Sequence, residues 1–390
     1  MKILLLTRFL SAGVGGAEYV GALIAELLAK NGHQVWVITN KMEGITTIEH
    51  ENIHTVFVSS RKPYPEGMRL KKTEPFRYNL SAIKAGLSII KKEKIDIIHS
   101  NQNFGTYAGF TGSVLCSLTG VPHIMLIHHL SSRDADFRKR ILKNMEESKI
   151  NPIIRSFLEK FLIKLKCSAI HTVSESTRDD LIHLGEKKPI YVIPNAIPIT
   201  VHSDYVPTPF QFVSISRLVY YKNLQIVIKA LKIVKEKFPN VKLIVIGDGP
   251  YKLNLEKLVS SLKLQENVNF KNHVSENEKE KLIATSQAIV FPSLYEGFGM
   301  VILESFAQKR PVLVSNVRPM SDIVEHGKTG LVMPPQDEKE WAKAIDLIIQ
   351  DPKHTSNMGE EGKKVLEEKY SIESMKYNLL RMYHEQIQNK

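Results

Sequence analysis

Two glutamates and two basic residues stand directly after segments that are typical of buried strands. Glu296 and Glu304 are separated by seven residues and follow one apolar run. Arg217 and Lys222 follow another. Arginine offers a phosphate a planar fork and lysine offers a mobile point charge, so together they could neutralise a diphosphate without a metal. If these four side chains act together, they predict a site for a phosphorylated ligand. The alternatives are two surface bases for the segment with Arg217 and Lys222 and, for the segment with the glutamates, a pair of loop glycines and a solvated helix glutamate.

The segment between the two glutamates predicts the start of a helix, flanked by Gly297 and Gly299. Glycine allows a backbone to approach a ligand closely, and the free N–H groups of a helix N-terminus attract anions. A phosphate could therefore rest on backbone amides at this point. The residues that would supply them are Phe298, Gly299, Met300 and Val301. Glu296 would lie near the group that the phosphate carries, and Glu304, inside the helix, could accept hydrogen bonds from sugar hydroxyls.

Strand and helix patterns alternate along the chain, and the strands are near-continuous apolar runs. Such runs are typical of parallel strands that are buried on both faces. Predicted strands cover 2–7, 34–39, 53–58, 95–99, 123–128, 169–173, 190–193, 211–216, 241–246, 268–271, 288–291 and 311–315. Repeated β-α units of this kind predict an α/β fold of two Rossmann-like, doubly wound parallel-sheet lobes. Ligands of such sheets bind beyond the carboxyl ends of the strands, so we expect an interdomain cleft to hold the site.

A cluster of four prolines between Pro194 and Pro209 predicts the domain boundary, because proline fixes φ and lacks a backbone donor. We expect a first domain at 1–195, a proline-rich linker at 196–210 and a second domain at 211–370. The segment 371–390 is predicted to be a C-terminal helix that could pack back on the first domain.

These motifs resemble the family 4 retaining glycosyltransferases of the GT-B fold, and the resemblance extends over nearly the whole chain. Its most specific part is the pair Arg217 and Lys222 followed by Glu296-x7-Glu304. Further matching motifs are Gly15-Gly16-Ala17-Glu18, Asp96-Ile-Ile-His99, Pro122 followed six residues later by His128, Thr172-Val-Ser174-Glu175, Pro194-Asn195 and Gly247-Asp248-Gly249-Pro250. The order and spacing of these motifs make the combination more specific than any one of them.

The resemblance implies a role for individual residues. Arg217 and Lys222 match the pair that grips the diphosphate of a nucleotide-sugar, and Glu304 matches the carboxylate that holds the ribose. Glu296 matches the carboxylate that faces the transferred sugar. In the first lobe, Gly16 matches a glycine whose backbone approaches the phosphates. His128 matches a histidine beside the donor sugar. Backbone groups near Gly247 and Val274 are expected to recognise the base.

Two features of the first lobe leave alternatives open. His129 follows His128, so the spacing alone does not decide which imidazole faces the donor, although the distance from Pro122 favours His128. Asn101 stands where many relatives have a second histidine, which could alter the acceptor side.

Composition excludes several other classes of protein. The chain of 390 residues has only Cys116 and Cys167 as cysteines, which is too few for a disulfide framework and fits a reducing compartment. There is no apolar run long enough to span a membrane, so we expect a cytoplasmic protein. No metal-ligand motif or Walker A loop appears, so neither a metal nor a cofactor is expected. The turn 13–18 has Glu18 in place of the third glycine of a dinucleotide fingerprint, which argues against a dehydrogenase.

The net charge of +12 is concentrated in the first 200 residues, which carry 27 basic and 18 acidic side chains. Segment 61–94 alone holds ten Lys/Arg and three Glu. This segment, or the basic amphipathic stretch 151–166, could rest on anionic lipid. Such contact would place the protein at the inner face of a membrane. The alternatives are a solvated lysine-rich surface and, for 151–166, a packed amphipathic helix.

Together these features predict a metal-independent retaining glycosyltransferase. It would move a sugar from a UDP- or GDP-linked donor to an acceptor hydroxyl in lipid-linked or cell-surface glycan synthesis. A GT-B nucleotide-sugar 2-epimerase shares the architecture and is an alternative that needs no acceptor. A basic nucleic-acid-binding protein is a second alternative, but it leaves the paired bases and glutamates unexplained, so we expect no nucleic-acid partner.

Overall fold

A computed structural model of the chain describes residues 1–10, 16–40, 48–58, 74–102, 107–130, 160–161, 163–198 and 205–389. The described residues form two compact units. The first comprises residues up to Asn195 together with those from Ile372 onward, and the second runs from Ala196 to Ser371. Every helix in this described part is too short or too polar to cross a membrane.

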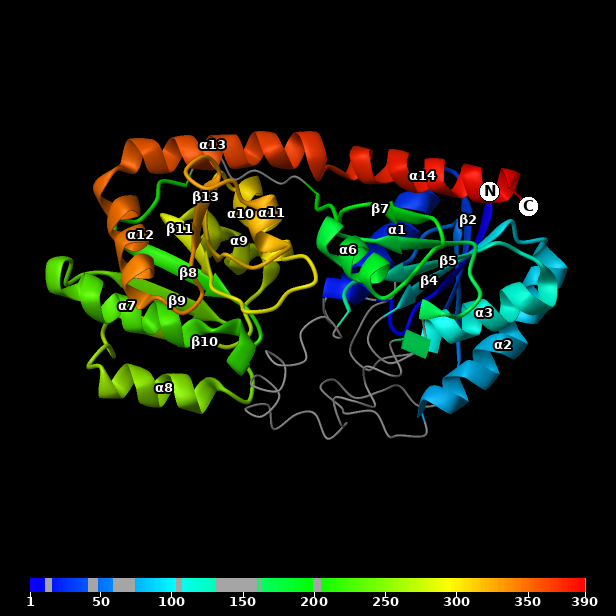
Figure 1. The fold of residues 1–390 in the computed structure, drawn as a ribbon, viewed down its shortest axis with the longest axis horizontal. Coiled ribbons are helices and arrows are strands. Elements are labelled where there is room, and N and C mark those ends of the chain that lie inside the picture. The colour runs from blue at the N-terminus through cyan, green and yellow to red at the C-terminus, as the bar shows by residue number, and fades with distance from the viewer. Residues whose placement is uncertain are drawn as a thin grey trace. The chain divides into compact units, whose positions relative to one another are not determined.

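The first unit is built on a seven-stranded, all-parallel sheet with the order β3-β2-β1-β4-β5-β6-β7 (Figure 1). Its elements are β1 (Lys2–Leu6), α1 (Gly16–Lys30), β2 (Gln34–Thr39), β3 (Ile53–Phe57), α2 (Glu74–Glu93), β4 (Ile97–Gln102), α3 (Tyr107–Thr119), β5 (His123–Ile127), β6 (Ala169–Thr172), α6 (Glu175–His183), β7 (Ile190–Val192) and α14 (Ile372–Gln388). Strands such as β5 and β6 are buried at every residue, because helices cover the sheet on both faces.

The C-terminal helix α14 packs on the first unit although it follows the second unit in the sequence. Its Tyr383 is fully buried and its hydroxyl lies 2.6 Å from His99 Nδ1. Nearer the helix end, Glu385 accepts a 2.6 Å hydrogen bond from the Tyr191 hydroxyl. These contacts join α14 to strands β4 and β7.

The second unit is built on a six-stranded, all-parallel sheet with the order β10-β9-β8-β11-β12-β13. Its elements are β8 (Gln211–Ile215), η1 (Tyr220–Lys222), α7 (Leu224–Lys237), β9 (Lys242–Ile246), α8 (Lys252–Ser261), β10 (Val268–Lys271), α9 (Glu276–Ala284), β11 (Ala288–Phe291), α10 (Met300–Ala307), β12 (Val312–Ser315), α11 (Met320–Ile323), β13 (Gly330–Met333), α12 (Glu338–Gln350) and α13 (Pro352–Lys369). The prediction of two doubly wound parallel sheets is confirmed, whereas β13 has no counterpart among the strands predicted from the sequence.

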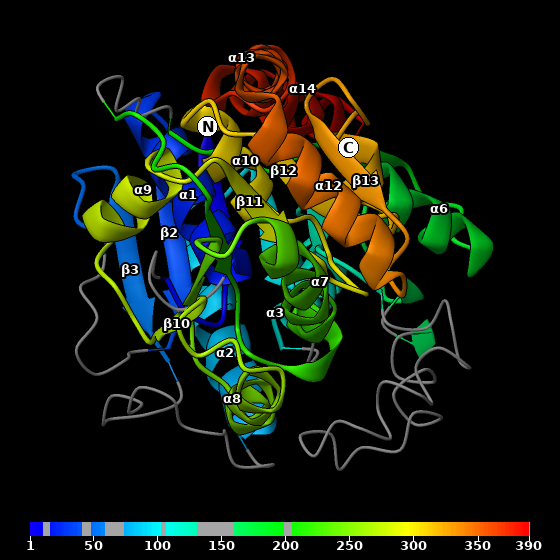
Figure 2. The same cartoon turned by 90° about the vertical axis from the view of Figure 1, so that its left-hand side faces the viewer.

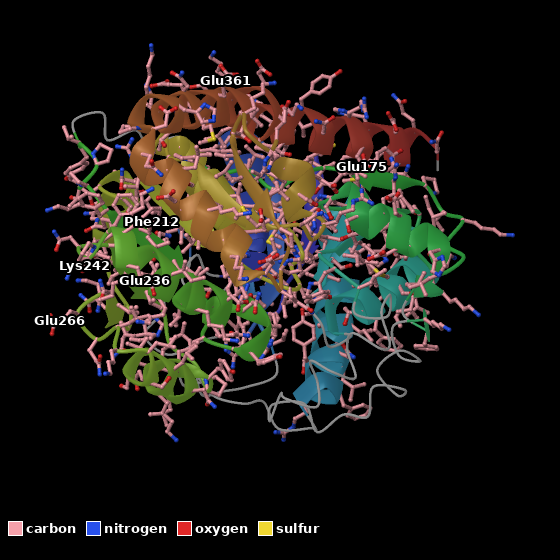
Figure 3. All side chains as sticks on the ribbon, turned by 60° about the vertical axis from the view of Figure 1, so that its left-hand side comes forward. Glu175, Phe212, Glu236, Lys242, Glu266 and Glu361 are labelled. Carbon is pink, nitrogen blue, oxygen red and sulfur yellow. The ribbon has the colours of Figure 1, made fainter. Side chains whose placement is uncertain are left out.

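Helices cover both faces of the second sheet (Figure 2). Helices α7, α8 and α12 pack on one face, and α9, α10 and α13 pack on the other. Phe212 of β8, Glu361 of α13 and Glu236 of α7 are labelled in Figure 3. Phe212 belongs to a continuous apolar core that also contains the fully buried Trp341 of α12. This buried core lies beneath the sheet that ends in the loops after β8 and β11.

Residues 205–210 of the predicted linker are hydrogen-bonded to the second unit. Thr208 N donates to Thr285 O at 2.8 Å, and Phe210 N donates to Gln287 Oε1 at 2.7 Å. Arg310 also donates to the carbonyl of Tyr205 at 2.9 Å. Residues 205–210 therefore lie against the unit that follows them.

Candidate functional site

The loops after β8 and β11 are tied together in the second unit. The backbone N–H of Leu294, after β11, donates to the carbonyl of Tyr221, in the short 3₁₀ helix η1, at 2.8 Å. Asn223 ends η1 in the left-handed region, with φ at 58°, and its side-chain amide donates to Pro335 O at 2.8 Å. The hydrogen bond between Leu294 and Tyr221 places Lys222 beside the segment that carries Glu296.

Lys222 and Glu296 form an ion pair in which Lys222 Nζ donates to Glu296 Oε1. The same carboxylate oxygen accepts a 3.0 Å hydrogen bond from Ser293 Oγ. Both charged side chains are largely buried, with 15% and 14% of their surface exposed. The ammonium lies 5.3 Å from the centroid of the Phe291 ring. A cation and a carboxylate are thus held together in a partly desolvated place, where electrostatic interactions are stronger than in water.

Helix α10 begins directly after this pair. Its N-cap is Gly299, whose φ of 101° is a conformation that residues with a Cβ rarely adopt. Glycine has no side chain with which to cap the first turn, and no side-chain cap bond is present. Phe298, immediately before the cap, is buried. Its ring packs edge-on against the Tyr370 ring, with 5.9 Å between the ring centroids. The N-terminus of α10 therefore supplies a partial positive charge near Glu296, together with backbone donors of Met300 and Val301.

Glu304 lies on α10 and is paired with a lysine of α9. Its Oε1 is 3.1 Å from Lys279 Nζ on α9. Its Oε2 is buried and has no hydrogen-bond partner among the residues that the structure describes. Burial raises the pKa of this carboxyl, and the ammonium of Lys279 acts in the opposite direction. Lys279 is not among the residues predicted from the sequence, because a lysine three residues after Glu276 is an ordinary feature of an exposed helix.

Arg217 and Gly247 meet at the carboxyl end of β8. Arg217 is exposed in the loop after the strand. The preceding residue, Ser216, is bonded through its N–H to Ile246 O at 3.1 Å. A Cβ on Gly247 would lie 2.0 Å from the Ser216 carbonyl oxygen. The structure thus gives Gly247 a packing role, since close contact with the loop that carries Arg217 needs a residue without a side chain. Val274, between β10 and α9, is half-buried.

In the first unit, His128 and the start of α1 are joined through Asn101. The Asn101 amide donates to Ala17 O at 2.7 Å, and its Oδ1 lies 2.6 Å from His128 Nε2. A carbonyl can only accept, so the orientation of the Asn101 amide follows, and His128 must carry its proton on Nε2. Burial lowers the pKa of His128 to about 3, so the ring is neutral with Nδ1 as an acceptor. Gly16, at the exposed N-terminus of α1, precedes Ala17, whereas Gly15 lies outside the described residues.

Three other buried histidines, His99, His123 and His171, have structural hydrogen bonds. His171 Nε2 donates to Ile193 O at 3.1 Å, so its Nδ1 accepts from His99 Nε2 at 3.3 Å. The Tyr383 hydroxyl then donates to His99 Nδ1. Burial lowers the pKa of His123 and His171 to about 4. Among the described residues, no group of three His, Cys, Asp or Glu side chains could hold a metal ion.

Each half of the chain matches the model of a known protein family. The family model "Glycosyl transferases group 1" matches residues 203–365, and the model "Glycosyltransferase Family 4" matches residues 14–201. The chain is 27% identical over 98% of both chains to an uncharacterized glycosyltransferase of Methanocaldococcus jannaschii. It is 30% identical to the O-antigen chain mannosyltransferase of Salmonella typhimurium, over 53% of this chain and 58% of that one.

A solved structure shows the same fold. HepE of Anabaena, in complex with UDP and glucose, matches with a TM-score of 0.75 and 19% identity, over 99% of this chain and 100% of that one. The two parallel-sheet units thus define a protein of the GT-B class. The chain belongs to the glycosyl transferases group 1, with a first half of the family 4 type, as the sequence motifs predicted.

Proposed function

We propose that this glycosyltransferase is a metal-independent, retaining enzyme that uses a UDP- or GDP-linked sugar. The observation that carries the proposal is the ion pair between Lys222 and Glu296 beside the uncapped N-terminus of α10. This arrangement holds a cation and backbone donors where a diphosphate could bind, and it holds a carboxylate next to them. The crystallised complex of HepE with UDP and glucose supports UDP as the first nucleotide to test.

In the proposed reaction, the bond between the anomeric carbon of the sugar and the diphosphate oxygen breaks. The acceptor oxygen forms its bond to that carbon on the same face, and the acceptor proton passes to the departing phosphate oxygen. Negative charge grows on the diphosphate in the transition state. Arg217, Lys222 and the amides at the start of α10 would stabilise that charge without reorganising.

Glu296 and Glu304 would act on different parts of the donor. Before the donor binds, Glu296 neutralises Lys222. A diphosphate would share Lys222 with Glu296 and leave the carboxylate to accept hydrogen bonds from the transferred sugar. Glu304 would hold the ribose through its unpartnered Oε2. In the first unit, the neutral His128 would accept from a sugar hydroxyl through Nδ1, and the backbone at Gly16 would approach the phosphates.

Thermal stability against a panel of UDP-, GDP-, ADP- and dTDP-sugars, run with EDTA, tests the donor and the absence of a metal requirement. A ligand at about 100 times its dissociation constant should stabilise the protein by roughly 2.7 kcal/mol. We expect a UDP- or GDP-sugar to raise Tm in EDTA, and Glu304→Ala to remove most of that shift. A shift that appears only when Mg²⁺ is added back would contradict the metal-independent mechanism. Donor consumption without any acceptor would instead support the epimerase alternative.

The acceptor is proposed to be a lipid-linked or surface glycan, in line with the O-antigen chain named for the Salmonella relative. Helix α2 supports contact with a membrane that carries such an acceptor. Phe76 and Leu80 are 68% and 56% exposed, although both are apolar and lie one turn apart. Arg77 and Lys84 are exposed on the same helix. Apolar side chains flanked by basic ones are typical of a helix that lies on anionic lipid. Residues 61–73 and 151–159 lie outside the described residues.

Binding to phosphatidylglycerol vesicles tests this surface. The double variant Arg77→Gln/Lys84→Gln should bind about thirtyfold more weakly than the wild-type protein, since each basic residue near anionic lipid contributes about 1 kcal/mol. Lys229→Gln/Lys232→Gln is the matched control, because it removes two exposed charges from α7. Equal weakening in both double variants, or unchanged binding in the first, would exclude α2 as the contact surface.

A further inference from the structure

Lys279 is a lysine of α9 that makes two ion pairs at once. Its ammonium lies 2.6 Å from Glu276 Oε2 and 3.1 Å from Glu304 Oε1. Only 18% of its side chain is exposed, whereas 78% of the Glu276 side chain is exposed. One of the two carboxylates is therefore a surface group, and the other lies on α10, within the proposed nucleotide site.

The contact with Lys279 gives the two carboxylate oxygens of Glu304 different roles. Oε1 accepts from Lys279, which fixes the rotamer of the carboxylate. Oε2 is buried and lacks a hydrogen-bond partner among the described residues. Buried acceptors without partners are rare in folded proteins and call for an explanation such as a bound ligand. A pair of hydroxyl donors would satisfy this oxygen.

We propose that Lys279 is a positioning residue, which holds Glu304 so that Oε2 accepts from the ribose hydroxyls and the site selects ribonucleotides over 2′-deoxyribonucleotides. This inference rests on the proposed nucleotide-sugar donor. A lysine at this place keeps the carboxylate oriented in the empty site, so that little side-chain entropy is lost when the nucleotide binds. The preference for ribose follows because a 2′-deoxyribose leaves the buried oxygen with fewer donors.

The pH dependence of nucleotide binding provides a second test of the role of Lys279. The charged groups that act on Glu304 are Lys279, Glu276 and Glu280, all on α9. Burial and the two glutamates raise the pKa of Glu304, and Lys279 lowers it. Without Lys279 the pKa rises further, so the carboxyl takes up a proton at a higher pH. Nucleotide binding needs the carboxylate as an acceptor, so it is lost when the pH falls and Glu304 takes up a proton. In Lys279→Met this loss should occur at a higher pH than in the wild-type protein.

Calorimetric titration with UDP, GDP and ADP, each beside its 2′-deoxy counterpart, tests the inference. We expect Lys279→Met to weaken binding of the preferred ribonucleotide about tenfold and its 2′-deoxy form less than twofold. Lys279→Arg, which keeps the charge, should retain most of the preference for ribose. Lys281→Met is the matched control, because Lys281 is exposed on the same helix, and its binding and pH profile should equal those of the wild-type protein.

The outcomes separate this inference from the proposed function. If no nucleotide binds the wild-type protein, the proposed donor is wrong and the inference falls with it. If nucleotides bind but Lys279→Met weakens ribo and 2′-deoxy forms equally, Lys279 has only a structural role. If Lys279→Met does not fold, Glu304→Gln provides the test. If Glu304→Gln prefers ribose over 2′-deoxyribose as strongly as the wild-type protein does, the inference is overturned.

Discussion

Replacing Lys222 by alanine should lower kcat about a thousandfold, because loss of one preorganised donor to developing charge costs about two to three orders of magnitude. The ammonium is held against Glu296 and near the Phe291 ring, where little water screens it. In the proposed reaction it faces the diphosphate as the charge grows. Its removal should therefore slow sugar transfer far more than it weakens donor binding. Steady-state transfer rates with the donor found in the panel would measure the effect.

Lys237→Ala is the matched control for this prediction. Lys237 belongs to the same unit and is paired with Asp346, but 56% of its side chain is exposed, so its loss should change kcat less than twofold. Near-equal Tm values for the two variants would show that the fold is retained. A Lys222→Ala enzyme that keeps more than a tenth of the wild-type kcat would remove Lys222 from the diphosphate site.

Gly247→Ala should cost about 3 kcal/mol of folding stability and abolish nucleotide binding. The backbone of Gly247 has a φ of 135°, and an added Cβ would lie 2.0 Å from the Ser216 carbonyl oxygen. Neither backbone can move without disturbing the parallel pairing of β8 and β9. The loop that carries Arg217 would then be displaced. Urea unfolding and nucleotide titration would measure the two effects.

Gly327→Ala separates the clash from the cost of the backbone conformation. Gly327 also has a positive φ, of 76°, but an added Cβ would meet nothing within 4 Å. Its replacement should cost only about 1 kcal/mol and leave nucleotide binding unchanged. Equal losses of stability in the two variants would show that the contact with Ser216 contributes nothing beyond the strained φ.

Much of the fold and part of the site could be predicted from the sequence. Near-continuous apolar strands identify parallel sheets, because only a sheet covered on both faces tolerates them. The strand β13 was not predicted, because it begins with Gly330 and only three apolar residues follow before Pro334. Lys222 and Glu296 were selected because each follows a strand, and carboxyl ends of parallel strands meet at one edge. The structure shows that the two side chains form an ion pair.

Other features depend on contacts between distant parts of the chain. The sequence placed Glu304 in a helix, but Lys279, 25 residues away, decides which of its oxygens is free. The sequence left open whether His128 or His129 faces the donor. The structure shows that Asn101 imposes a tautomer on His128 and does not decide between the two rings.

The sequence by itself therefore determined the fold class, the family and the residue types at the strand ends, since these depend on local periodicity and motif spacing. Only the tertiary structure decided that Gly247 packs on Ser216, that α14 belongs to the first unit, and that Lys279 holds Glu304. Those properties arise from packing between segments that the chain separates by tens or hundreds of residues. Local sequence patterns do not predict such contacts, because the same helix would form, and the same glycine would be tolerated, next to a different neighbour.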